Sequence, residues 1–391
     1  MRFRLLIAAL LTAALVASAP AYAKPADRAA ALAAYQAEVT DESVPAGWTG
    51  SVEGCVVGTE SADSLAATRR TVNTLRDFTG LGPISFDDAL NHKALAAALM
   101  MRAQNDLSHD PPPSWACYSA DGKDGASHSN LYLGISGPAA MVGYVDDSGI
   151  PTLGHRAWVL DPSASVFGSG STGTTNALYV VSGQSVPVPA NSTVPWPPAG
   201  WVPWQWIFGD WSVHVGGDNQ TVSFQDPQVT VTADGQPVAV SGVRKLGDTL
   251  AWNVDLPQGL TSGDHVLHVS VSGAIVAGQP LPIDYDVKAF AAAAPIPVLR
   301  WVHKPSIARR DGKKRPVRRG VRLKVSASVA DGHISGYRWL RGGKAIKGAT
   351  KATYKVSKAD RGKRVACRVT AISSDGSKTL QRTSRSIRVA N

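Results

Sequence analysis

Apolar side chains recur at helical spacing in three segments of the first half of the chain. Residues 64–78 and 86–107 place apolar residues three to four positions apart, and residues 138–145 form a shorter run of the same kind. Side chains with this spacing fall on one face of an α-helix. Gly80, which follows the first run, is a common helix stop. The pattern predicts three helices that pack through one face.

The pattern changes after Pro162. In residues 163–182, Val, Phe, Leu and Tyr alternate with Gly, Ser and Thr, which predicts two strands joined by a turn. The letters GSGSTG at 168–173 match a dinucleotide-binding pattern but lack the helix and the downstream acid of such a site, so we interpret them as the turn. Helices followed by a short sheet predict a layered α-β-α unit.

Short alternating segments continue to the end of the chain. They predict a β-sandwich over about 187–290 and another all-β domain over 291–391. The entry to the first of these, residues 187–211, holds five tryptophans among prolines. Such a cluster is either an aromatic platform for sugars or, more commonly, packing between a linker and its neighbours.

The first 23 residues have the pattern of a signal peptide. Arg2 and Arg4 precede an apolar run over 5–17, and Ala-Tyr-Ala at 21–23 is a small-x-small cleavage pattern. The run is shorter than a membrane-spanning helix, and no later segment is long and apolar enough to span. We therefore expect a secreted protein, extracellular or associated with the cell envelope, that starts with a connecting arm over 24–48.

The distribution of charged residues marks a domain boundary near residue 300 more clearly than the proline- and glycine-rich loop sequences do. Residues 300–391 contain 26 Lys and Arg against four Asp, a net charge of +22, whereas residues 24–299 contain 12 basic and 26 acidic residues, a net charge of −14. The chain is thus predicted to be an acidic body with a strongly basic tail domain.

The sequence contains only three cysteines, so at most one disulfide can form within the chain. In an oxidising compartment Cys55 and Cys117 are expected to form a disulfide; the alternative is two buried free thiols. Cys367 is far along the chain and is expected to be a small buried hydrophobe.

The first domain, predicted over 49–186, resembles bacterial members of the CAP superfamily, the cysteine-rich secretory, antigen 5 and pathogenesis-related 1 proteins, also called SCP domains. The stretches that carry the resemblance are VNTLRDFTGLGPISFDDAL (72–90), ALMMRAQNDLSHDPP (98–112), SNLYLG (129–134) and LGHRAWVLDP (153–162) followed by FGSGST. The resemblance implies an α-β-α sandwich, which agrees with the element order above. The whole chain is then a multidomain protein, with this α-β-α sandwich, a β-sandwich over 187–290 and a basic Ig-like domain over 291–391.

The resemblance also implies a cleft that two histidines and two glutamates face, where some members bind a divalent metal. The histidines correspond to His109 and His155, but Ser129 stands where one glutamate is expected. Asp146 or Asp147 is a shorter substitute for the other glutamate, and His128 brings a third imidazole. Three imidazoles with water suit zinc. The candidate metal ligands are therefore His109, His128 and His155, with zinc or calcium as the ion; the alternative is that the histidines bond to backbone and fix loops.

No catalytic residue can be assigned from motifs, since GxSxG, HExxH and CxxC are absent. A Ser/His pair is one alternative, with Ser129 or Ser108 near His155 and an aspartate orienting the imidazole. The main hypothesis is non-enzymatic binding of a lipid, sterol or envelope component in the cleft, as the family implies. Its rivals are a metal-dependent or Ser/His hydrolase acting on envelope polymers, and a structural adhesion protein.

The tail resembles the bacterial immunoglobulin-like modules of secreted proteins through YRWLRGGKAIKGATKATYKVSKADRGKRVACRVTA (337–371). Trp339 and Cys367 hold the core positions of an Ig sandwich, and the first cysteine is missing. A dense basic charge attracts polyanions such as teichoic acids, acidic glycans or, non-specifically, nucleic acid. The residues predicted to bind them are Arg309, Arg310, Lys313, Lys314, Arg315, Arg318 and Arg319.

Overall fold

The computed structural model describes residues 24–257, 260–261, 263–292, 300–312, 315–330, 332–373 and 379–391. The predicted signal peptide, Lys313 and Lys314 lie outside the described residues. The described residues form two compact units, one of residues 24–38 with 46–292 and the other of residues 39–45 with those from 300 on. The predicted boundary near residue 187 falls inside the first unit. In the described part, no helix is long and apolar enough to cross a membrane.

A four-stranded sheet lies at the centre of the first part of the chain. Its strands are ordered β1 (Ser85–Phe86), β3 (Val166–Ser171), β4 (Thr175–Tyr179) and β2 (Ser129–Leu133). β1 pairs with β3 in parallel, and the other neighbours are antiparallel. The two strands predicted after Pro162 are β3 and β4.

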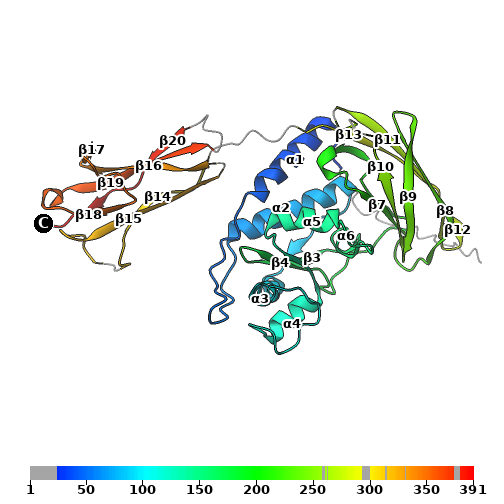
Figure 1. Ribbon diagram of the computed structural model, residues 1–391, viewed down its shortest axis with the longest axis horizontal. Helices are drawn as coiled ribbons and strands as arrows, with labels where there is room; N and C mark the ends of the chain where they lie inside the picture. Colours follow the sequence, from blue (N-terminus) through cyan, green and yellow to red (C-terminus); the bar gives the residue numbers. More distant parts are fainter. Residues whose placement is uncertain are drawn as a thin grey trace, which may run out of the picture. The chain divides into compact units, whose positions relative to one another are not determined.

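Helices cover both faces of this sheet (Figure 1). α2 (Ala62–Thr79) and α5 (Pro138–Asp146) pack on one face, and α3 (Asp88–Gln104) and α4 (Ala120–Ser127) on the other. Ser61 caps the first turn of α2, and Gly80 ends it in the left-handed conformation. The three predicted helices are confirmed with small changes of boundary, and the layers form an α-β-α sandwich.

The GSGSTG segment is a strand over most of its length, so its interpretation as a turn was wrong for residues 168–171. A Cβ atom on Gly170 would lie 2.0 Å from the backbone nitrogen of Leu95, and one on Gly168 would lie 2.5 Å from Leu90. The glycines therefore let α3 approach the sheet closely. Only residues 172–174 connect the two strands.

The predicted connecting arm contains a helix, α1 (Arg28–Glu42). Its side chains Ala31 and Tyr35 are buried, and the Tyr35 ring meets the edge of Trp206 at a centroid distance of 5.4 Å. Arg28 pairs with Asp264 at 2.7 Å. The alanine-rich sequence hid this helix because its apolar stripe is short and its partners come from distant strands.

A sheet of nine strands follows α6 (Gly154–Val159) in the first unit. Its hydrogen-bonded path is β5 (Thr193–Trp196), β7 (Asp210–Val215), β10 (Thr249–Asp255), β9 (Gln236–Leu246), β8 (Val222–Ala233), β11 (His265–Val276), β13 (Ile283–Phe290) and β6 (Gly200–Pro203), with β12 (Gln279–Pro280) beside β11. The two ends of this path, β5 and β6, are consecutive in sequence. The predicted β-rich segment is confirmed.

The tryptophans near its entry are packed inside. Trp196, Trp206 and Trp211 are at most 2% exposed, and Trp204 is also buried in the 3₁₀ turn η1 (Trp204–Trp206). The Trp206 ring lies between Tyr35 of α1 and Phe78 of α2. The packing interpretation is therefore correct for these four rings. The fifth, Trp201, is half-buried and meets the Phe290 ring edge-on.

From residue 300 on, the described part of the second unit is built of strands, which form two sheets around a core that includes Trp339. One sheet is β14 (Arg300–Arg309), β15 (Arg322–Ala330) and β18 (Thr353–Lys355); the other is β17 (Lys344–Ala345), β16 (Gly332–Arg341), β19 (Arg364–Ser373) and β20 (Thr379–Thr383), with β21 (Ile387–Arg388) beside β19. Trp339 and Cys367 face each other in register on β16 and β19, and both are fully buried. Cys367 is a free thiol, and burial raises its pKa to about 11. Next to this core, the short turn η2 (Lys358–Asp360) buries Asp360 as the partner of Arg341.

The predicted disulfide is present. Cys55 and Cys117 are bonded, with Cα atoms 5.0 Å apart. The bond joins the segment before α2 to the connection between α3 and α4. It thus closes a loop that the chain-entropy model credits with about 4 kcal/mol of stabilisation.

Glu60, which precedes α2, is buried against β3. Ser64 donates its hydroxyl hydrogen bond to one carboxylate oxygen, and the backbone N–H of Ser171 donates to the other at 2.7 Å. Burial raises the pKa of Glu60 from 4.5 to about 7, although these hydrogen bonds oppose the rise. The folded protein therefore binds this proton more tightly than the unfolded chain does.

We predict that this proton makes the free energy of unfolding of the first unit fall as the pH rises from about 4.5 to about 7, by on the order of 3 kcal/mol from Glu60 alone. Glu60→Gln removes the titrating group, so its unfolding free energy should vary less over this pH range. Urea unfolding at several pH values measures the slope. Glu53→Gln, a change at an exposed glutamate, is the control and should leave the slope unchanged.

Candidate functional site

The segment that contains His155 folds as the short helix α6. Asp147 ends α5 in the left-handed conformation, with φ at 51°, and its side chain turns toward α6. One of its oxygens, Oδ2, accepts hydrogen bonds from the backbone N–H groups of His155 and Arg156, at 3.0 and 3.2 Å. A single buried carboxylate thus satisfies two backbone donors of the first turn of α6.

The same carboxylate orients the imidazole of His155. Oδ1 of Asp147 lies 2.6 Å from His155 Nδ1, and the Asp147 side chain is only 1% exposed whereas that of His155 is 25% exposed. The Tyr144 ring packs on the imidazole at 5.5 Å. With Nδ1 facing Asp147, Nε2 is the nitrogen available to a ligand.

This imidazole lines a cavity of about 250 Å³. Its apolar lining comes from β2, α5 and two loops: Leu107, Leu131, Tyr132, Leu133, Tyr144 and Ile150. Its polar lining is His155 with Asp146, Asp147 and Ser148. Leu107 and Ile150 are each 40% exposed, so the cavity opens to solvent through apolar side chains. We call this cavity the cleft.

His109 and His128 are bonded elsewhere, to helix α4. His109 Nδ1 lies 2.9 Å from the backbone oxygen of Ala126. His128 Nδ1 lies 2.9 Å from the backbone oxygen of Asp124, and its ring stacks on Tyr179 at 5.2 Å. Neither histidine lines the cleft.

The three histidines therefore do not fit a shared metal centre. Within the residues that the structure describes, no group of three or more His, Cys, Asp or Glu side chains could hold a metal ion. Backbone oxygens of α4 lie against His109 and His128. The alternative interpretation, backbone bonds from His109 and His155, therefore fits His109, whereas the imidazole of His155 meets the side chain of Asp147. No metal-dependent step follows from this geometry.

Ser129, at the position expected for a glutamate, is buried in β2, and its hydroxyl has no hydrogen-bond partner. Ser108 accepts a hydrogen bond from the Asp110 N–H. Ser148 donates to Asp146. In the described part of the chain, no serine is hydrogen-bonded to His155, although Asp147 orients the imidazole as a Ser/His mechanism requires.

Arg156, which sequence reasoning missed, ties the cleft to the nine-stranded sheet. Its guanidinium is buried and donates to the backbone oxygens of Val145 at 2.6 Å and Asp146 at 2.9 Å. It also donates to the backbone oxygen of Asp210 at 2.9 Å and to the Ser212 hydroxyl at 3.1 Å, both on β7. Burial lowers the pKa of Arg156 to about 10, and neighbouring carboxylates, Asp147 first, oppose that shift.

The other end of α6 is held by a second buried guanidinium. Arg76 of α2 donates to the backbone oxygens of Val159 and Asp161, each at 2.9 Å, and to that of Ala164 at 3.1 Å. Carbonyl oxygens at the end of a helix lack intrahelical donors, so Arg76 supplies them. The α6 segment is thereby fixed at both ends.

In the second unit, a shallow hollow of about 560 Å³ is lined by Arg309, Arg310, Arg319 and Arg322, with Asp311 beside them. Arg309 is paired bidentately with Asp311, at 2.8 and 2.6 Å, and is only 15% exposed. Arg310, Arg315, Arg318 and Arg319 are exposed. Of the predicted polyanion-binding residues, Arg309 is therefore engaged in an ion pair within its own loop, whereas the exposed arginines are accessible to a ligand. We call this hollow the arginine hollow.

A comparison with protein families matches residues 69–184 to CAP, the cysteine-rich secretory protein family. The chain therefore carries a CAP domain, and the match includes His109 and His155. No curated protein matches the chain.

Solved structures similar to the chain include fibronectin(III)-like modules of Clostridium thermocellum CbhA, at 14% identity and a TM-score of 0.16, covering 51% of this chain and 94% of that one. Another is Bacteroides ovatus SGBP-B from a mixed-linkage glucan utilization locus, in complex with a mixed-linkage heptasaccharide. It is 19% identical with a TM-score of 0.13, covering 47% of this chain and 41% of that one.

Proposed function

We propose that this CAP-domain protein is secreted, binds a single-chain lipid in the cleft, and is attached to anionic surface polymers by its second unit. The observation that carries the proposal is the cleft itself, a cavity with apolar and aromatic walls on one side and acidic and hydroxyl groups beside an oriented imidazole on the other. The Cys55–Cys117 disulfide is consistent with an oxidising compartment and so with secretion.

The size and lining of the cleft favour an acyl chain over a sterol. At about 250 Å³ it lies just below the usual range of ligand pockets, about 300–1,000 Å³, which suits a slender chain better than a rigid ring system. Leu107, Leu131 and Ile150 offer apolar contact. Asp146 and Ser148 beside His155 offer hydrogen bonds to a hydroxyl-bearing head group.

A second candidate function is hydrolysis, because the Asp147–His155 pair has the arrangement of an oriented general base. An ester bond placed beside Nε2 would be attacked by water rather than by a serine, since no serine is bonded to this imidazole in the described residues. An ester-linked probe therefore distinguishes binding from hydrolysis.

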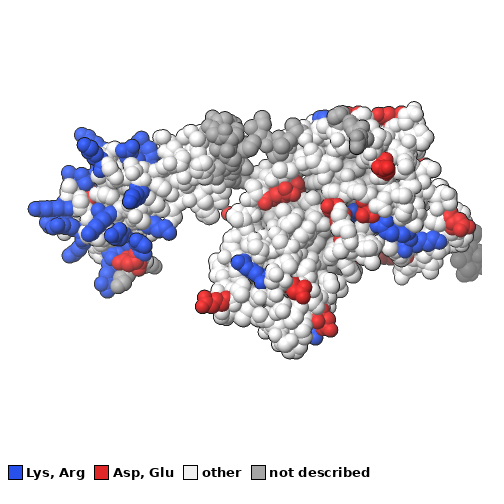
Figure 2. All heavy atoms as spheres, viewed as in Figure 1, with Lys and Arg blue, Asp and Glu red and all other residues white. Residues whose placement is uncertain are grey.

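The second unit supplies the attachment. Figure 2 shows Lys and Arg gathered densely over this unit, whereas they are sparse and mixed with acids on the visible face of the first. Exposed arginines surround the arginine hollow. A surface of this charge density attracts polyanions over roughly the Debye length, about 8 Å at physiological salt.

We predict that the protein binds a fluorescent monoacylglycerol and that Leu107→Glu weakens this binding at least about tenfold, because a carboxylate would be placed in the apolar mouth of the cleft. Val186→Glu is the control, since Val186 is also exposed but does not line the cleft. Fluorescence titration measures binding, and mass spectrometry of the probe detects cleavage.

Unchanged probe favours the binding function, whereas cleavage that is lost in His155→Ala favours the hydrolase. The lipid proposal is wrong if the parent protein does not bind the probe or if both glutamate variants weaken it equally.

We predict that the protein binds long-chain polyphosphate, a polymer of anionic phosphates, and that binding weakens as salt rises. Arg310→Gln, Arg319→Gln and Arg322→Gln together should lower the slope of log affinity against log salt by about two to three, because each lost arginine neutralises about one phosphate fewer. The control removes the same charge elsewhere in this unit, with Lys344, Lys347 and Lys351 changed to Gln. Equal slopes for the two triple variants would contradict the assignment to the arginine hollow, and binding independent of salt would contradict attachment by charge.

A further inference from the structure

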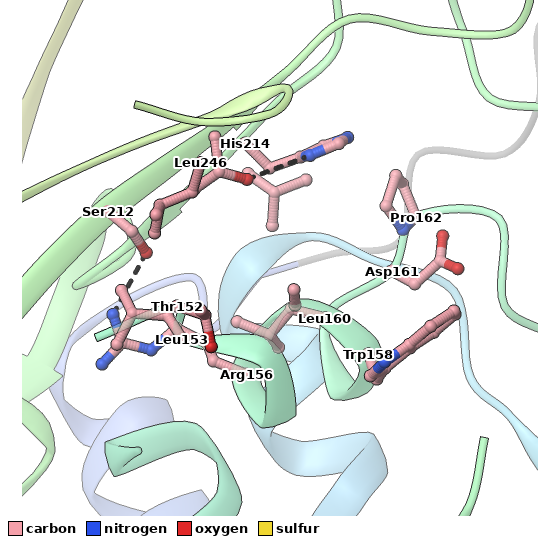
Figure 3. Close-up of a pocket in the computed structure, with 13 residues that line it drawn as sticks. Thr152, Leu153, Arg156, Trp158, Leu160, Asp161, Pro162, Ser212, His214 and Leu246 are labelled. Carbon is pink, nitrogen blue, oxygen red and sulfur yellow. Dashed lines mark hydrogen bonds between the residues drawn. The ribbon is translucent and has the colours of Figure 1, made fainter. Parts of the chain in front are cut away.

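A second cavity, about 280 Å³ in volume, lies where α6 meets β5, β7, β9 and β10. In Figure 3, Leu160 rises from the helix side toward His214 and Leu246 on the strand side, with Asp161 and Pro162 beyond it. Most of its walls are apolar: Leu153, Ala157, Leu160, Pro162, Val194 and Leu246. It shares no lining residue with the cleft around His155. We call this cavity the junction pocket.

The one cationic side chain in its wall is not available to a ligand. Arg156 lines the junction pocket, but its guanidinium already donates hydrogen bonds to the backbone oxygens of Val145, Asp146 and Asp210 and to the Ser212 hydroxyl. Figure 3 shows the bond to Ser212 as a dashed line. A ligand anion would therefore find no free positive charge from this arginine.

Three acidic side chains lie around His214 at the other end of the pocket. Asp161 and His214 line both the junction pocket and an adjoining hollow of about 180 Å³, where Asp248 and Asp218 are exposed. Burial lowers the pKa of His214, and the nearby carboxylates Asp248 and Asp161 oppose that shift. Asp161 and Asp248 thus both lie close to His214, Asp161 in the lining of the junction pocket and Asp248 in that of the adjoining hollow. The buried guanidinium of Arg76 is also close to Asp161 and donates to its backbone oxygen.

The mouth also carries an aromatic face. Trp158 lines the junction pocket and is 43% exposed, and Asp161 lies three residues further along the chain, just after the end of α6. A tryptophan face attracts cations, and more strongly when a carboxylate stands close by. An apolar cavity with an exposed indole, the carboxylate of Asp161 in its lining and that of Asp248 in the adjoining hollow is complementary to one kind of small ligand.

We propose that the junction pocket binds a small organic cation, an amine whose apolar body lies against Leu160 and Leu246 and whose charged head faces Asp161 and Asp248. The cavity volume suits a body of about ten non-hydrogen atoms. Because the pocket is built from both α6 and the nine-stranded sheet, a bound amine also bridges these two parts of the first unit. This proposal does not depend on the lipid proposed for the cleft.

The test uses the full chain and three probes of one shape and different charge: 4-phenylbutylamine, 4-phenylbutan-1-ol and 5-phenylpentanoate. Isothermal titration calorimetry measures each dissociation constant. The amine is expected to bind with a dissociation constant below about 1 mM, the alcohol several-fold more weakly, and the carboxylate most weakly. Equal binding of the three probes, or no binding of the amine, overturns the proposal.

Two variants locate the site. Ala157→Trp places a bulky side chain in the pocket from an exposed position and should abolish amine binding without disturbing the core. Ile135→Trp, an equally bulky change at an exposed residue outside the pocket, should leave it intact. Amine binding that survives Ala157→Trp contradicts the assigned site.

The charge of the site is tested by Asp248→Asn, which should weaken the amine about two- to five-fold and leave the alcohol unchanged. Asp226→Asn, at an acid away from the pocket lining, is the matched control. If the two variants weaken the amine equally, or if neither weakens it, the carboxylates do not recognise the head group and the proposal for a cation is wrong.

Discussion

The carboxylate of Asp147 is the contact on which the candidate site depends. One of its oxygens receives the backbone N–H groups of His155 and Arg156, and the other meets the imidazole of His155. Because the side chain is almost wholly buried, removing it would leave unpaired donors in the interior. From this point Arg156 extends to β7 and Arg76 fixes the far end of α6. The cleft on one side of α6 and the junction pocket on the other thus share one rigid helix.

Much of the architecture could be predicted because it follows local periodicity. The stripes of α2, α3 and α5 and the alternation of β3 and β4 are visible in short windows, and Gly80 marks an end by its backbone freedom. α1 could not be found this way. Its buried face is small, and the Trp206 ring that covers Tyr35 stands some 170 residues later in the chain. Arg156 could not be found either, because its partners on β7, Asp210 and Ser212, lie 54 and 56 residues later in the chain.

The candidate site was predictable only in part, for a different reason. His155 and Asp147 are eight residues apart in the chain, and the resemblance implied that both face the cleft. Their proximity could therefore be predicted. His109 corresponds to a histidine of the family, and His128 is adjacent to Ser129, the position expected for a glutamate. In the structure both imidazoles lie against backbone oxygens of α4, and such contacts cannot be predicted from residue types alone. The basic tail shows the reverse case. The charge of this domain follows directly from its composition. The ion pair with Asp311, which makes Arg309 unavailable to a polyanion, is visible only in the structure of the loop.

The claim that α6 couples the cleft to the nine-stranded sheet is tested most directly by native-state hydrogen exchange in Arg156→Gln. The account predicts that the amide of His155 and those of β7 lose protection together, by about 3 kcal/mol, because buried carbonyl partners of Arg156 are left unpaired on both sides. The amides of β16 in the second unit serve as the internal reference and should not change. Protection lost near His155 with β7 unchanged would contradict the coupling.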